Sequence, residues 1–106
     1  MGATERLPRI TRLLALALRL EDLLREGTIG SYTELARLGG VSRARITQLL
    51  NLRNLAPAIQ EEILLLGPRN RIEKLTEPAV RQLTATMDWR RQRALFQELM
   101  QNPAVG

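Results

Sequence analysis

Apolar residues recur along the first quarter of the chain at the three- and four-residue spacing of a helix. The pattern predicts a helix from about Pro8 to Arg25 that ends before Gly27, because glycine commonly follows a helix C-terminus. At about 100° per residue its apolar arc covers roughly 220°. The arc contains Ile10, Leu13, Leu14, Leu16, Ala17, Leu18, Leu20, Leu23 and Leu24. A surface helix buries less than this, so we expect the helix to be deeply buried or to contact a partner as well.

Capping residues and breaks divide the rest of the chain into shorter helices. The predicted helices run from a cap at Ser31 to Leu38, from a cap at Ser42 to Leu50 or Asn51, from Pro57 to Leu66, from a cap at Thr76 to about Thr86, and from a cap at Asp88 to about Gln101. Residues 52–55 form a connection and residues 69–74 a basic loop. No segment has the alternation typical of a strand. The pattern predicts an all-α, compact multi-helix domain of about five to six helices, and a single domain over residues 1–106.

The segment at about residues 31–51 has the pattern of a helix-turn-helix. Ala36 is small, as needed where a second helix crosses closely, and Gly40 falls at the turn, where a left-handed backbone costs least without a Cβ. We expect Ser31 and Glu34 to form a capping box in which the Glu34 carboxylate reaches back to Ser31. The residues expected to fill the angle between the two helices are Val41, Ile46 and Leu49.

The second helix of the motif divides into an apolar face and an outward polar face. The residues expected to contact base edges are Arg43, Ala44, Thr47, Gln48 and Asn51. Amides pair with adenine, arginine with guanine, and Ala or Thr methyls contact the thymine methyl. The residues expected to contact phosphates or position the domain are Ser31, Tyr32, Thr33, Arg37, Ser42, Arg45, Arg53, Arg69, Arg71 and Lys74. The alternatives are a solvated polar helix face and, for residues 69–74, a solvated basic loop.

Composition narrows the possible functions. The chain has 16 Lys and Arg against 11 Asp and Glu, a net charge of +5, and every basic residue except Lys74 is Arg. This charge fits a polyanionic partner, although a GC-rich genome would also favour Arg over Lys. His and Cys are absent, which removes most general bases, nucleophiles and zinc ligands. We therefore expect no enzyme activity, no cofactor and no metal.

The N-terminal apolar run does not indicate a membrane protein. Arg19, Glu21 and Asp22 interrupt it soon after Leu18, no convincing signal-peptide cleavage site follows, and the run is too short to span a bilayer. We expect a cytoplasmic protein with no membrane partner.

Beyond the motif, residues 30–83 resemble the central DNA-binding domain of ParB-type partition proteins and the related KorB repressors. The resemblance rests on Tyr32-Thr33-Glu34-Leu35-Ala36, Gly40-Val41-Ser42-Arg43, Gln48-Leu49-Leu50-Asn51-Leu52, Leu55-Ala56-Pro57-Ala58-Ile59-Gln60-Glu61-Glu62-Ile63, Leu75-Thr76-Glu77 and Val80-Arg81-Gln82-Leu83. It implies an all-helical domain that binds an inverted repeat with its recognition helix in the major groove. We expect no counterpart of the family's N-terminal nucleotide-binding and C-terminal dimerisation domains, so CTP binding and DNA clamping are not carried over.

The sequence thus predicts sequence-specific binding of double-stranded DNA, by a transcriptional regulator or a partition- or mobile-element-associated protein. The alternative is an adaptor module for a recombinase or a partition ATPase. A homodimer is expected, because one helix-turn-helix contacts only a short half-site and successive half-sites lie about 34 Å apart. The candidate dimer surfaces are Leu16, Leu18 and Leu23 in the first helix, and Trp89, Phe96, Leu99 and Met100 in the last.

Overall fold

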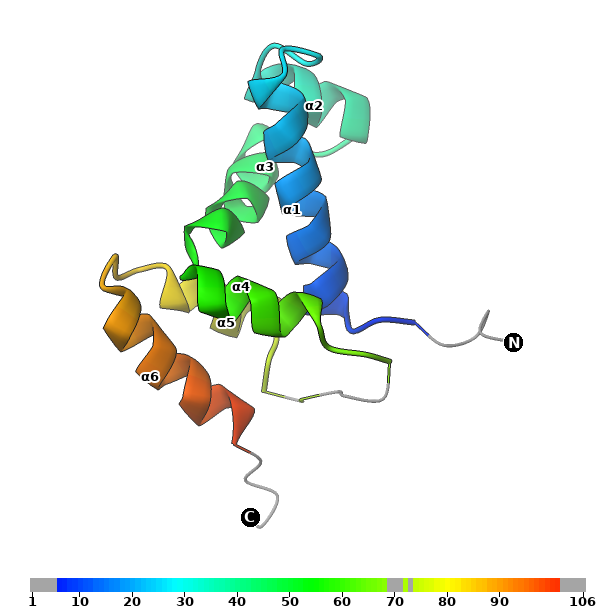
Figure 1. Ribbon diagram of the computed structural model, residues 1–106. Helices are drawn as coiled ribbons and strands as arrows, with labels where there is room; N and C mark the ends of the chain where they lie inside the picture. Colours follow the sequence, from blue (N-terminus) through cyan, green and yellow to red (C-terminus); the bar gives the residue numbers. More distant parts are fainter. Residues whose placement is uncertain (1–5, 69–71, 73, 102–106) are drawn as a thin grey trace.

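The computed structural model describes residues 6–68, 72 and 74–101, and within these ranges the chain is helical with no strand. The elements are α1 (Arg9–Arg25), α2 (Tyr32–Gly39), α3 (Arg43–Leu50), the 3-10 helix η2 (Asn51–Asn54), α4 (Pro57–Leu64), α5 (Glu77–Leu83) and α6 (Trp89–Met100). Figure 1 shows α1 running down the molecule between the α2–α3 pair and α4, with α6 at the lower edge. The all-α prediction is confirmed.

Side-chain caps start the helices where the sequence predicted them. Ser31 Oγ accepts from Glu34 N at 3.1 Å and Ser42 Oγ accepts from Arg45 N at 3.0 Å. The same role falls to Thr76 at α5 and to Asp88 at α6. One detail of the capping box was wrong. The Glu34 carboxylate accepts from the backbone N–H of Gly30, at 2.8 Å, and not from Ser31.

Two helices end earlier than predicted, for local reasons. At the end of α5, Thr84 Oγ1 donates to the carbonyl of Arg81 at 2.6 Å, and such a side-chain bond competes with continuation of the helix. At the end of α4, Leu66 N donates to Ile63 O at 3.2 Å in a tighter turn, which places Leu66 against the core. The ends of α4 and α5 are therefore Leu64 and Leu83.

Helix α1 contributes to both hydrophobic cores of the domain. In the larger core, the first half of α1 packs against η2, α4, α5 and α6. The buried residues of this core are Ile10, Leu14, Ala17, Leu52, Leu55, Ala56, Ile59, Ile63, Leu75, Val80, Leu83 and Phe96. In the smaller core, the second half of α1 packs against α2 and α3 through Leu20 and Leu24. The buried residues of this core are Leu35, Ala36, Ile46 and Leu50. The wide apolar arc of α1 is therefore used mainly inside the chain.

The two candidate dimer faces are buried only in part. On α1, Leu16 is exposed, whereas Leu18 and Leu23 are partly buried. On α6, Phe96 is buried and Trp89 is exposed. Leu99 and Met100 pack partly against the larger core. The homodimer stays a prediction.

A buried amide fixes α6 to the rest of the domain. Gln92 is fully buried, and its Oε1 accepts from the backbone N–H of Ala56, itself fully buried, at 2.7 Å. Its Nε2 donates to Thr86 O at 2.9 Å and to Asn54 O at 3.3 Å. One side chain therefore satisfies backbone groups from the η2–α4 junction and from the α5–α6 loop.

Replacing Gln92 with Met keeps the side-chain volume but removes these bonds. Because the Ala56 N–H would remain buried without an acceptor, we expect a loss of about 1–3 kcal/mol in the free energy of unfolding. Chemical denaturation measures this. Gln97→Met, at an exposed position of the same helix, is the control and should change stability by less than about 0.5 kcal/mol. Equal stability of the two variants would contradict a structural role for Gln92.

Candidate nucleic-acid interface

The turn between α2 and α3 has the geometry that a helix-turn-helix requires. Only Gly40, Val41 and Ser42 separate the two helices. Gly40 has φ of +66°, and its N–H donates to Arg37 O while Val41 N donates to Ala36 O at 3.0 Å. These two bonds form the Schellman motif, which favours glycine at the left-handed position. The turn predicted from Gly40 is therefore present.

The filling of the interhelical angle differs from the prediction at one position. Val41 is 42% exposed rather than buried. A Cβ added at Gly39 would lie 3.8 Å from a Val41 methyl group, so the Val41 side chain lies beside Gly39. Ile46 and Leu49 are buried as predicted. Leu35 and Ala36 of α2 pack with Ile46 in the smaller core and close the angle.

The outer face of α3 is open to solvent. Of the five predicted base-contacting residues, Arg43, Ala44, Thr47 and Asn51 are exposed and Gln48 is partly buried. The Arg43 guanidinium lies over the Tyr32 ring, 5.9 Å from its centroid, in a cation–π arrangement. Thr47 is exposed, and its Oγ1 donates to Arg43 O at 3.3 Å. The structure thus brings the predicted base-contacting side chains onto one surface.

One side of α3 is fixed by an ion pair to α5. Arg45 places Nη1 and Nη2 against the two carboxylate oxygens of Glu77, with Nη2 2.9 Å from Oε1. The Glu77 side chain is only 9% exposed, and Arg81 Nε lies 3.4 Å from its Oε2. Arg45 Nη1 also donates to Gln48 Oε1 at 3.2 Å. Arg45, predicted to contact phosphate, is therefore engaged within the protein.

These contacts shift the pKa of both partners. The hydrogen bond from Arg45 lowers the pKa of Glu77 below its ordinary value, partly opposed by desolvation, with further lowering from the charges of Arg45, Arg81 and Arg9. The pKa of Arg45 is raised, mainly by the same hydrogen bond. The pair is therefore fully charged at neutral pH.

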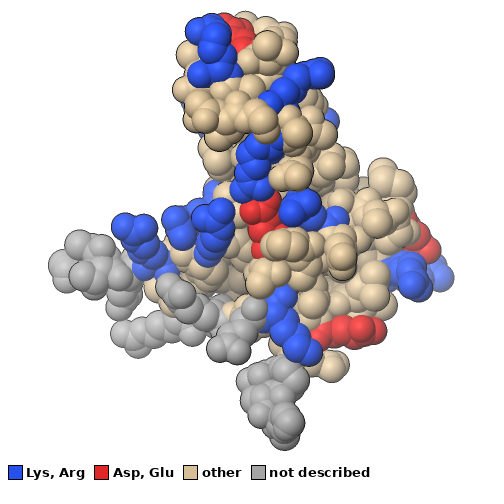
Figure 2. Space-filling model, turned by 180° about the vertical axis from the view of Figure 1, so that it is seen from behind, with Lys and Arg blue, Asp and Glu red and all other residues tan. Residues whose placement is uncertain are grey.

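The other predicted phosphate contacts are distributed around the motif. Arg53 pairs with Glu21 at 3.0 Å and also donates to the Tyr32 hydroxyl at 3.5 Å. Ser31, Thr33, Arg37, Ser42 and Lys74 are exposed. Arg69 and Arg71 lie outside the described residues. Figure 2 shows Lys and Arg side chains spread over one face of the molecule from top to bottom, with smaller groups of Asp and Glu among them.

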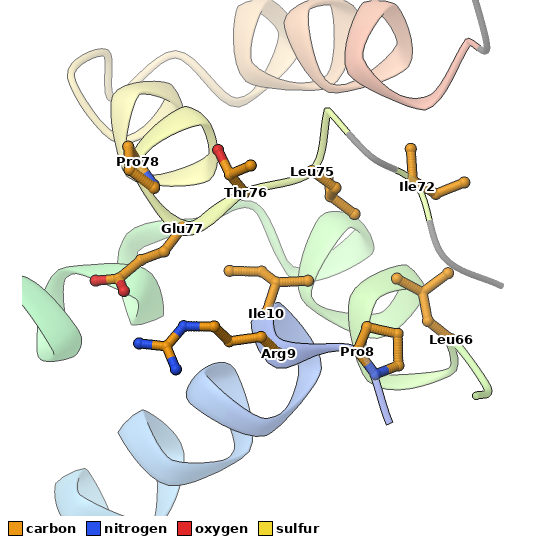
Figure 3. Close-up of a pocket in the computed structure, with 9 residues that line it drawn as sticks. All are labelled: Pro8, Arg9, Ile10, Leu66, Ile72, Leu75, Thr76, Glu77 and Pro78. Carbon is orange, nitrogen blue, oxygen red and sulfur yellow. The ribbon is translucent and has the colours of Figure 1, made fainter. Parts of the chain in front are cut away.

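A cavity of about 720 Å³ lies next to this network, between the start of α1 and the start of α5. It is lined by Pro8, Arg9, Ile10, Leu66, Ile72, Leu75, Thr76, Glu77 and Pro78. Figure 3 shows Arg9 and Glu77 extending toward the same end of the cavity, away from Leu66 and Ile72. Glu77 therefore lies between the cavity and α3.

Comparison with models of known protein families, with curated proteins and with solved structures gave no match to this chain. Among the described residues, none of the helices combines the length and the apolar character needed to cross a membrane.

Sequence reasoning missed Glu77 as part of this site. Glu77 directly follows the Thr76 cap. An acidic residue is favourable in the first turn of any helix, so its presence there did not indicate a further role. Its partner Arg45 is 32 residues away in the sequence. No local pattern identifies such a pair.

Glu77→Gln should make stability less dependent on pH in the acid range. A carboxylate whose pKa is lowered by folding contributes stability above its unfolded-state pKa, and this contribution is lost as pH falls through the folded-state pKa. The wild type should therefore exceed Glu77→Gln by about 1.5–3 kcal/mol near neutral pH. The difference should shrink as pH falls below the ordinary value of 4.5.

Thermal or chemical unfolding across this range measures the difference. Glu62→Gln removes an exposed carboxylate from α4 and serves as the matched control. A constant stability difference between wild type and Glu77→Gln from neutral pH to well below 4.5 would show that Glu77 ionisation does not stabilise the fold.

Proposed function

We propose that the chain binds double-stranded DNA in a sequence-specific manner, with α3 in the major groove. The observation that supports this most is the outer face of α3. Arg43, Ala44 and Thr47 are exposed there, as is Asn51 directly after the helix, and α3 contains no Asp or Glu. A carboxylate on this face would be repelled by the phosphates, and its absence leaves only groups that pair with base edges.

Each side chain on this face has a base partner that its chemistry fits. Arg43 suits the O6 and N7 acceptors of guanine, and stacking on Tyr32 restricts its guanidinium before binding. The Thr47 methyl suits the thymine methyl, and the exposed Asn51 amide suits adenine. Arg37 is available for phosphate contact, because its nearest carboxylate, on Glu34, is 4.0 Å away and exposed.

The resemblance of residues 30–83 to ParB and KorB domains supports the same proposal and adds an inverted repeat as the target. Two copies of the chain would then bind one site, as a regulator of transcription or a partition- or mobile-element-associated protein. The net charge of the chain, +5, would attract it to the negatively charged DNA.

Selection from a random duplex library tests the proposal. We expect the wild type to enrich one sequence family. Gln48→Ala should bind the enriched duplex about 1–3 kcal/mol more weakly and lose preference at one or two base pairs. Gln97→Ala, on α6, should retain both affinity and preference. The proposal fails if the wild type enriches no sequence, or if Gln48→Ala loses affinity equally for the enriched and for random duplexes.

A further inference from the structure

The contact between Arg45 and Gln48 determines how the Gln48 amide is turned. A guanidinium has only hydrogen-bond donors, so the Gln48 atom 3.2 Å from Arg45 Nη1 must be the oxygen. The amide nitrogen is then on the other side of the group, and no described residue accepts a hydrogen bond from it. As far as the described residues go, Gln48 therefore keeps two unpaired donors, while its acceptor is held by Arg45.

Arg45 can hold the amide because Glu77 holds Arg45. The carboxylate binds the guanidinium through both oxygens, a geometry that fixes the plane of the guanidinium. Glu77 is itself restrained, since it is nine-tenths buried, lies in the first turn of a helix capped by Thr76, and has Arg81 at 3.4 Å. Orientation is thus passed from α5 through Arg45 to Gln48.

This orientation changes which base Gln48 would select. A free glutamine amide pairs with adenine by turning both its oxygen and its nitrogen to the base edge. Here the oxygen is held at the side, so the base would meet mainly the NH2 group. Guanine offers two acceptors, O6 and N7, whereas adenine offers N7 next to its own N6 donor.

We propose that Glu77 is a specificity-determining residue, which acts through Arg45 to make Gln48 prefer guanine over adenine in the major groove. This inference rests on the proposed function. Glu77 is a positioning residue, because it acts on the base only through its two neighbours. It also keeps Arg45 from the phosphates, so loss of the carboxylate would release a cation next to the DNA.

Two variants test the inference, by selection from the same library and by salt titration. Glu77→Gln should shift the base pair identified by Gln48→Ala from guanine toward adenine, by about 5- to 10-fold in the ratio of the two bases. It should also steepen the slope of log affinity against log salt by about 0.9, because the released Arg45 gains a phosphate. Arg45→Met should give the same base shift with no steeper slope. Glu21→Gln, which breaks the separate ion pair to Arg53, should leave the base preference unchanged.

The outcomes separate this inference from the proposed function. If the wild type enriches no sequence, the proposed function fails. If it enriches a sequence but the guanine preference is unchanged in both Glu77→Gln and Arg45→Met, the inference is overturned and the proposed function stands. The same holds if the Gln48 base pair is not guanine in the wild type. Should Glu77→Gln fail to fold, Arg45→Met decides alone, since Glu77 keeps Arg81 as a partner in that variant.

Discussion

The packing of α1 is the constraint on which the rest of the structure depends. Leu14 and Ala17 have no exposed surface and lie in the larger core, while Leu20 and Leu24 reach the smaller core between α2 and α3. The buried bond from Thr11 Oγ1 to Ile63 O, 2.8 Å long, ties the same helix to α4. Since α1 is the one helix of the described part of the chain with side chains in both cores, it sets where α2 and α3 lie relative to α4 and α5.

Helix α3 is fixed on its inner face and on the flank toward α5, whereas its outer face is exposed. Ile46 and Leu50 pack inward, and the ion pair between Arg45 and Glu77 fixes the flank toward α5. On the outer face, Arg43, Thr47 and Asn51 are exposed. The ion pairs also neutralise part of the positive charge near α3, because Arg45 and Arg53 are paired with carboxylates. Positive charge for an external partner then comes mainly from exposed side chains such as Arg37 and Arg43.

Most features that depend on neighbouring residues were predicted from the sequence, whereas those that depend on distant residues were missed. The caps at Ser31 and Ser42 and the left-handed Gly40 follow from interactions within a few positions, and the structure contains them. The predicted end of α5 was wrong, because the Thr84 hydroxyl donates to a backbone carbonyl and so competes with continuation of the helix. The roles of Glu77 and Gln92 need partners 32 and 36 residues away.

For the candidate site, pattern reasoning placed the base-contacting set on the outer face of α3, where four of its members are exposed. It could not show that Gln48 is partly buried and bound to Arg45. Both side chains lie on one helix three positions apart, so their contact was sterically available. The Arg45 guanidinium that contacts Gln48 is bound by the Glu77 carboxylate, which lies 32 residues away in the sequence.

Photocrosslinking from the floor of the major groove tests most directly whether α3 contacts DNA. A selected duplex would carry a photoreactive diazirine on the 5-position of one thymine inside the binding site. Because trypsin cleaves after Arg45 and Arg53, the crosslinked peptide should be Ile46–Arg53, which carries Thr47, Gln48 and Asn51. The same probe placed outside the site should give no such peptide. Crosslinks confined to peptides of α4 or α6 would contradict the placement of α3 in the groove.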